Sequence, residues 1–375
     1  MRTASLVLAI AALTACSRPS FQSFFSSGEE YLAAGKHAEA VIEFQNASRA
    51  DPGSAAVQIK LAEAYAAMDQ PGHAAAAQER ACTLDPGNVP ACLEAASRLL
   101  ALGEYDRAGA AARQVLTKDR FNLDAELMLA SSLAGVRRFA DAEERVRAVL
   151  AAAPRDSRAY RALGRVQYQR GDATAAESSL LQAIELDRAS AETHTTLAQL
   201  YFDTGRPAEG AHQLRSALEI DPDDLTANRL YASYLVETNY CADAEPYWQT
   251  LAAESKDRSG SLALADYYVW IGRPDDALRV LEPLAAGPDR GGVARARVAA
   301  ILYDQGDRTA AARAVDELLA QDPGVDGLIL KARMSLNAPD MAQARDYAHR
   351  AAALAPQSPA VRDVLAAIAA VGSNR

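Results

Sequence analysis

A period of 34 residues runs through this chain from residue 21 almost to its end. When repeats start at residues 21, 55, 89, 123, 157, 191, 225, 258, 292 and 325, the eighth place is Gly or Ala in all ten. The twentieth place is also Gly or Ala in all ten. Small residues at two fixed places let two helices approach closely. The period therefore predicts ten copies of one helical hairpin.

Residues that end helices recur within this period. A glycine between the two helices of a repeat is expected in the left-handed conformation that closes a helix. It stands at Gly35, Gly103, Gly171, Gly205, Gly272 and Gly306, with Asn239 in its place once. A proline follows the second helix at Pro52, Pro86, Pro154, Pro222, Pro323 and Pro356. With a further short helix in the tail, the sequence predicts an all-α chain of 21 helices.

The first copy carries a recognisable pattern. The residues concerned are Gly28, Tyr31, Ala40, Phe44, Ala47 and Pro52, at places 8, 11, 20, 24, 27 and 32 of the repeat. This pattern resembles the tetratricopeptide repeat. The resemblance implies an α-solenoid, a right-handed superhelix of hairpins, with ten repeats over residues 21–359 and a capping helix and tail over residues 360–375. It also implies a concave face lined by the first helix of each repeat at places 2, 5, 9, 12 and 13.

Composition and motifs exclude several classes of function. The formal charge of -10 argues against a nucleic-acid surface, which needs clustered Lys and Arg. The five histidines are scattered without HExxH spacing, and GxSxG, Walker A and GxGxxG patterns are absent. We therefore expect no catalytic residues, no metal and no cofactor, and a protein that is not an enzyme.

The first 20 residues have the features of an export signal. Arg2 precedes an apolar run over residues 4–13, which is too short for a bilayer span of roughly 20 residues. Residues 13–16, LTAC, resemble the lipobox of bacterial lipoproteins. The resemblance implies that residues 1–15 are removed, that Cys16 is lipidated and that residues 16–20 form a short tether. The alternative is a plain secretory signal with a coincidental cysteine.

Ser17 follows Cys16 where an Asp retains many such lipoproteins at the inner membrane. By this resemblance we expect the protein to be lipid-anchored at the outer membrane, on the periplasmic side.

Three cysteines remain after Cys16. Cys82 and Cys92 flank the turn LDPGNVPA, and an oxidising periplasm permits a disulfide between them. The alternative is a pair of small buried residues. Cys241 is left over in both cases.

Cationic and aromatic residues fall on the expected concave face. Repeat five supplies Arg158, Arg161, Arg165 and Tyr168, repeat seven supplies Arg229 and repeat eight supplies Trp270. Arginine offers forked donors to carboxylates, and Trp and Arg often dominate interfaces, so we predict that these residues contact an acidic peptide or an anionic glycan. The alternative is a solvated face neutralised by nearby acids. Tyr267, next to a core tyrosine, is expected outside the core.

One stretch weakens the regularity of the repeats. Residues 282–294 contain Pro283, which is expected inside a helix, together with Pro288 and several glycines. We predict a hinge or a change of superhelix direction here, and the alternative is an ordinary long turn.

The combination of repeats and lipobox resembles the periplasmic repeat lipoproteins that serve pilus assembly, outer-membrane protein assembly and polysaccharide export with exosortase-type systems. Residues 30–52 most resemble the last group. Glu29 and Glu63 stand where the peptide-carboxylate clamp of some relatives has Asn. The first hypothesis is a noncatalytic, membrane-anchored scaffold for protein partners of a cell-envelope complex. The alternative is an accessory protein of polysaccharide export that binds a glycan or the export machinery.

Overall fold

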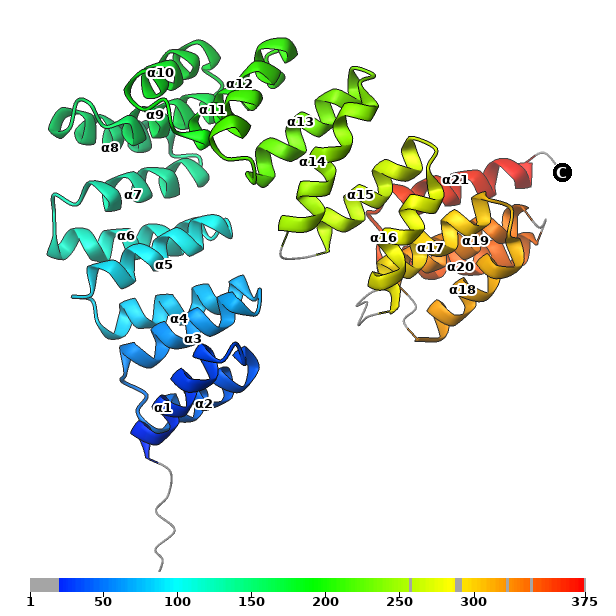
Figure 1. The fold of residues 1–375 in the computed structure, drawn as a ribbon, viewed down its shortest axis with the longest axis horizontal. Helices are drawn as coiled ribbons and strands as arrows, with labels where there is room; N and C mark the ends of the chain where they lie inside the picture. Colours follow the sequence, from blue (N-terminus) through cyan, green and yellow to red (C-terminus); the bar gives the residue numbers. More distant parts are fainter. Residues whose placement is uncertain (1–19, 256–257, 287–291, 322–323, 338–339, 374–375) are drawn as a thin grey trace, which may run out of the picture. The chain divides into compact units, whose positions relative to one another are not determined.

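The computed structural model describes residues 20–255, 258–286, 292–321, 324–337 and 340–373. Within these residues the chain forms 21 α-helices and no strand, which confirms the predicted all-α solenoid class (Figure 1). The chain divides into two compact units, Met1–Ala189 and Ser190–Arg375.

The first unit consists of five helical hairpins. Its first helices are α1 (Phe21–Ala33), α3 (Ala55–Ala67), α5 (Val89–Ala101), α7 (Leu123–Gly135) and α9 (Ser157–Arg170). Its second helices are α2 (His37–Ala50), α4 (Pro71–Leu84), α6 (Tyr105–Lys118), α8 (Phe139–Ala152) and α10 (Ala173–Leu186).

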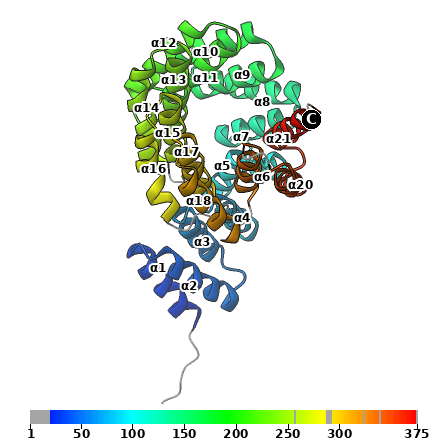
Figure 2. The ribbon, with the colours of Figure 1, turned by 90° about the vertical axis from the view of Figure 1, so that its right-hand side faces the viewer.

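The second unit continues the same alternation and ends with one extra helix. Its first helices are α11 (Ala191–Asp203), α13 (Leu225–Glu237), α15 (Ser259–Trp270), α17 (Val293–Asp304) and α19 (Val325–Asn337). Its second helices are α12 (Pro207–Ile220), α14 (Cys241–Glu254), α16 (Pro274–Ala286), α18 (Arg308–Gln321) and α20 (Met341–Leu354), followed by α21 (Pro359–Ser373). Within each unit, helices that are consecutive in sequence pack side by side (Figures 1 and 2).

Side-chain caps fix where many of the first helices begin. Ser54 accepts a hydrogen bond from the backbone N–H of Val57, and Asn122 does so from Ala125. Such a cap satisfies one of the N–H groups that the first turn of a helix leaves without a partner. Equivalent caps precede α1, α5, α9, α11 and α13, at Ser20, Asn88, Asp156, Ser190 and Asp224.

The turn inside each of the first nine hairpins contains a residue with positive φ. The glycines predicted for this role adopt it, as at Gly35 with φ 71° and Gly171 with φ 93°, and so does Asn239 with φ 66°. Two further turns use residues that the sequence did not mark, Asp69 with φ 53° and Arg137 with φ 62°. Side chains rarely take this conformation, because Cβ crowds the following carbonyl oxygen.

Small residues at places eight and twenty bring the two helices of a hairpin together. The alanines at these places are completely or almost completely buried throughout the described repeats. A Cβ added to Gly28 would lie 2.5 Å from the ring of Phe44, and one added to Gly164 would lie 2.7 Å from Leu180. Place eight of the first helix therefore packs against place twenty-four of the second.

A disulfide joins two consecutive repeats of the first unit. Cys82 in α4 and Cys92 in α5 are bonded, with Cα atoms 4.7 Å apart. This separation lies within the range that a disulfide spans without backbone movement. Both residues are buried in a core formed by α4 to α8 together with Val166. Of the two possibilities left open by the sequence, the structure contains the bridge.

The structure describes only part of the predicted hinge and of the amino-terminal segment. Pro283 lies inside α16 as expected, and Pro246 lies inside α14. Residues 287–291, at the centre of the predicted hinge, lie outside the described residues. The signal, Cys16 and most of the tether, residues 1–19, do so as well. Among the described helices, none is both long and apolar enough to cross a membrane.

Candidate functional site

A groove runs across the first helices of the last three repeats. Its volume is about 370 Å³, and it lies wholly within the second unit. Helices α15, α17, α19 and α21 supply its lining, which consists of Asp266, Val293, Ala296, Arg297, Ala300, Asp326, Ile329, Leu330, Arg333 and Ala360.

The lining follows the repeat frame. Asp266, Ala300 and Arg333 occupy place nine of consecutive repeats. Val293 and Asp326 occupy place two, Ala296 and Ile329 place five, and Arg297 and Leu330 place six. Places two, five and nine are those that the family resemblance assigns to the concave face. The first helices thus present one continuous surface in these repeats, as solenoid repeats do when they bind partners.

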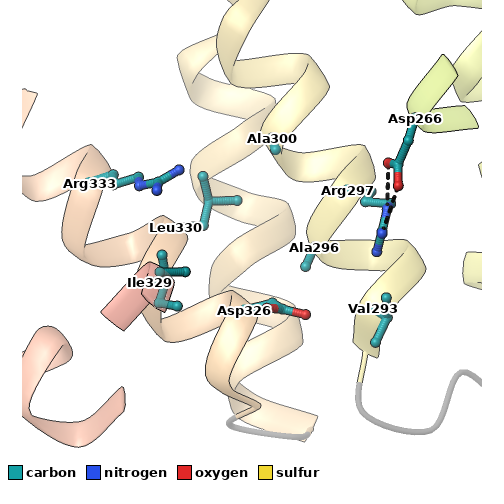
Figure 3. Close-up of a pocket in the computed structure, with 10 residues that line it drawn as sticks. Asp266, Val293, Ala296, Arg297, Ala300, Asp326, Ile329, Leu330 and Arg333 are labelled. Atoms are coloured by element: carbon teal, nitrogen blue, oxygen red, sulfur yellow. Dashed lines mark hydrogen bonds and ion pairs between the residues drawn. The ribbon is translucent and has the colours of Figure 1, made fainter. Parts of the chain in front are cut away.

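An ion pair connects two of the first helices at one side of the groove. Arg297 on α17 donates from Nε to Oδ1 of Asp266 on α15 at 2.8 Å, and from its terminal nitrogen to Oδ2 at 2.9 Å (Figure 3). The hydrogen bond to Asp266 raises the pKa of Arg297 above its ordinary value, although burial acts in the opposite direction. The two-point geometry holds the guanidinium in a fixed orientation.

Two further charged groups of the groove belong to α19. The side chains of Asp326 and Arg333 are exposed, and neither side chain forms a hydrogen bond or an ion pair within the described part of the chain. Asp326 lies near enough to Arg297 for its charge to contribute to the raised pKa of that arginine. Arg333 lies away from the Asp266–Arg297 pair in Figure 3. The carboxylate and the guanidinium are thus both accessible to a ligand.

The space between the charged groups is apolar. Ala296 and Ala300 stand one turn apart on α17, and Leu330 faces them from α19 (Figure 3). Two alanines at adjacent turns leave room that larger side chains would fill. The groove combines an apolar floor with charged groups at its sides, so it can bind a ligand through apolar contact and orient it through charge.

The residues predicted in repeat five lie in the first unit, on α9. Arg158 is exposed but is held by two carboxylates, 2.7 Å from Asp124 on α7 and 2.8 Å from Asp156. Arg161 is half-buried, and Arg165 is exposed one helical turn further on. An interaction partner in the fold is present for each of these two arginines and for Tyr168. Arg158 thus matches the alternative interpretation of this face, in which nearby acids neutralise its cations.

The other two predicted contact residues lie in the second unit. Arg229 is exposed on α13. Trp270 is 59% exposed near the end of α15. It follows Asp266 by four residues and therefore lies on the same face of that helix, one turn beyond the groove. Its contact with a partner stays a prediction.

One expectation about the aromatic residues was wrong. Tyr267 is buried, with 5% exposure, and its hydroxyl donates to the carbonyl oxygen of Cys241 at 2.6 Å. Burial raises the pKa of this tyrosine above its ordinary value. Its ring packs against that of its neighbour Tyr268 and, because α14 and α15 pack side by side, against Trp248 of α14.

Sequence reasoning missed the charged residues of the groove. The signal was nonetheless present, since the places assigned to the concave face include place two, where Asp326 stands in repeat ten, and place nine, where Asp266 and Arg333 stand in repeats eight and ten. Among the described residues, no group of three or more His, Cys, Asp or Glu side chains is placed to hold a metal ion.

The repeats match models of a known family. The tetratricopeptide repeat model matches residues 25–89, 127–191 and 299–359, and a second tetratricopeptide repeat model matches residues 167–234. Together these matches cover more than half of the chain, which therefore belongs to the tetratricopeptide repeat family. The fold is that of a scaffold for protein–protein interactions.

Solved structures of the same family resemble the chain. A tetratricopeptide repeat protein from Parabacteroides merdae is 14% identical with a TM-score of 0.51, covering 69% of this chain and 98% of its own. This likeness shows the shared fold. A thermophilic tetratricopeptide repeat protein of Thermus thermophilus is 25% identical with a TM-score of 0.43, covering 49% of this chain and 100% of its own.

PilF of Pseudomonas aeruginosa is also similar, at 25% identity and a TM-score of 0.39, over 56% of this chain and 97% of its own. The comparison with curated proteins gave no match.

Proposed function

We propose that this protein is a noncatalytic scaffold, anchored by a lipid on Cys16 to the periplasmic side of the outer membrane, that holds protein partners of a bacterial cell-envelope complex. The observation that carries the proposal is the groove across α15, α17 and α19, with its apolar floor and its fixed and accessible charges. A surface of this kind gives affinity through apolar contacts and specificity through charge.

Two features support a place in the cell envelope. Residues 1–16 have the features of a lipoprotein signal, and two acyl chains on Cys16 would anchor the chain stably. The Cys82–Cys92 disulfide is consistent with an exported protein, because disulfides persist in oxidising compartments and are rare in the cytosol.

Crosslinking in the native cells tests the scaffold role. A photoreactive residue replaces Ala300 in the groove, and a second chain carries it at Trp270 on α15. The matched control carries it at Glu317, which is exposed on the second helix α18. We expect one or a few discrete protein adducts from Ala300 and Trp270 that are absent from Glu317.

Other products of this experiment would change the proposal. A polydisperse adduct that disappears on glycan digestion would favour the polysaccharide-export role instead. Equal capture from Ala300 and Glu317 would show that the groove is not the binding surface.

Anchoring is tested separately by Cys16→Ser. A thiol is needed for the lipid bond, so we expect the variant to leave the membrane fraction while keeping the crosslinks of the groove in solution. A Cys16→Ser chain that stays in the outer membrane would contradict lipid anchoring.

A further inference from the structure

We infer that the groove of repeats eight to ten binds an extended polypeptide segment that carries an acidic and a basic side chain four residues apart, with a bulky apolar side chain midway between them on the same face. This inference rests on the proposed scaffold function and names the chemistry of its partner. It is carried by the opposite charges of Asp326 and Arg333 on α19 and by the apolar space against Ala296 and Ala300 on α17.

The charges show which groups the ligand presents. Of the four charged groups that line the groove, Asp266 and Arg297 already neutralise each other. Arg333 has no ion-pair partner among the described residues and attracts a carboxylate, to which its guanidinium can donate two parallel hydrogen bonds. The carboxylate of Asp326 is exposed and makes no hydrogen bond in that same part of the chain, so it can accept one from an ammonium or guanidinium group of the ligand.

The spacing of these charges sets the length of the ligand. Asp326 and Arg333 are seven residues apart, which places them on one face of α19 and about 10 Å apart along its axis. A free amino acid is too short to reach both groups. An extended chain advances about 3.3 Å per residue and its side chains alternate between two faces, so side chains four residues apart share a face and lie about 13 Å apart. The flexible side chains of Arg333 and of the ligand can make up the small difference from the distance along α19.

The apolar floor explains the middle of the segment. Ala296 and Ala300 leave space beside Leu330, and Ile329 is buried beneath it with 6% exposure. A bulky side chain placed there would lose contact with water over most of its surface. The opposite charges at either side of this space fix the direction of the segment.

The test uses short capped peptides as probes, each labelled with fluorescein. The first has the sequence Gly-Glu-Ala-Phe-Ala-Lys-Gly, which places Glu, Phe and Lys on one face when extended, and the second exchanges its Glu and Lys. Further probes carry two Glu, two Lys, or Ala in place of Phe. Binding to the full mature chain is followed by fluorescence anisotropy at low and at physiological salt. We expect one of the two mixed-charge peptides to bind at least fivefold more tightly than each of the other probes.

Charge-reversal variants give the decisive result. Asp326→Lys and Arg333→Glu should each weaken the preferred peptide at least fivefold. The double variant, Asp326→Lys with Arg333→Glu, should prefer the peptide with Glu and Lys exchanged. Both side chains are exposed, so the fold should tolerate the changes, which circular dichroism verifies. Glu317→Lys on α18 is the matched control and should leave all affinities unchanged.

Each outcome supports or overturns the inference about the ligand. Inversion of the preferred order in the double variant supports the inference. Equal affinity for all probes, or no binding of any probe to the natural chain, overturns it. The scaffold function itself fails only when Ala300 captures no protein in cells. A captured partner with no peptide binding would therefore reject the ligand chemistry and leave the scaffold in place.

Discussion

Replacing Gly28 with Ala should destabilise the first hairpin, although alanine favours helices over glycine by about 1 kcal/mol. The added Cβ would lie 2.5, 2.6 and 2.9 Å from three ring atoms of Phe44. Phe44 is completely buried and packs edge to face on Phe25, so its ring cannot move into solvent. Overpacking of this kind costs about 1–3 kcal/mol. Because three ring atoms would be met at less than 3 Å, the cost should lie at the upper end of this range, and the gain in helix propensity then leaves a net loss of about 2 kcal/mol.

Hydrogen exchange of α1 and α2 in the full chain measures this change. The hairpin lies at the end of the repeats, where local opening governs exchange, and about 2 kcal/mol corresponds to exchange roughly thirty times faster. The control is Gly72→Ala in α4, where an added Cβ would meet nothing within 4 Å. That variant should exchange at the same rate or more slowly in α4.

A second substitution separates packing from other effects. Phe44→Leu removes the ring atoms that the new methyl group meets. In this background Gly28→Ala should cost at least about 1 kcal/mol less than in the natural chain, because the two residues are in contact. Slower exchange of α1 in the single Gly28→Ala variant would refute the close-packing argument for place eight.

Two further predictions concern the first unit. The Cys82–Cys92 bridge closes a loop of ten residues, so Cys82→Ala with Cys92→Ala should cost about 3 kcal/mol and lower the melting temperature, whereas an unchanged melting curve would mean that the bridge adds no stability. The hydrogen bond from Arg158 holds the pKa of Asp156, the N-cap of α9, below its ordinary value. Its stabilisation is therefore present above about pH 3.9 and is lost as the pH falls through the lowered pKa. Asp156→Ala should speed exchange at the start of α9 at pH 7 by a factor that corresponds to about 1 kcal/mol and that shrinks in acid, while Asp156→Asn should keep most of the cap. An effect of Asp156→Ala that does not depend on pH would contradict the role of its charge.

The periodic features of the fold could be predicted because they depend on local rules. Small residues at two places of each repeat, glycines with positive φ and helix-ending prolines act within one hairpin, and the described residues contain the 21 helices that these rules predict. Arg137 is an exception to these local rules, because its positive φ is not predicted by its residue type. Nothing in an arginine indicates a positive φ, and the turn adopts it because both flanking helices are fixed by packing.

The groove could be predicted only in part, because it joins residues that are distant in sequence. Asp266 and Arg297 are 31 residues apart and meet only when α15 and α17 are placed side by side. Arg158 and Arg333 both stand at places that the family resemblance assigns to the concave face. Neighbouring carboxylates neutralise Arg158, whereas Arg333 has no ion-pair partner in the described residues. That difference depends on the charges of adjacent repeats. Tyr267 likewise became a core residue because α14 packs over it.

We propose that the first helices of the repeats hold a protein partner. The most direct test is a hydrogen-exchange footprint of the full chain with and without the protein captured from Ala300. We predict slower exchange in α15, α17 and α19, at residues around Asp266, Arg297 and Arg333, with α16, α18 and α20 unchanged. Slower exchange confined to α16, α18 and α20 would contradict the account.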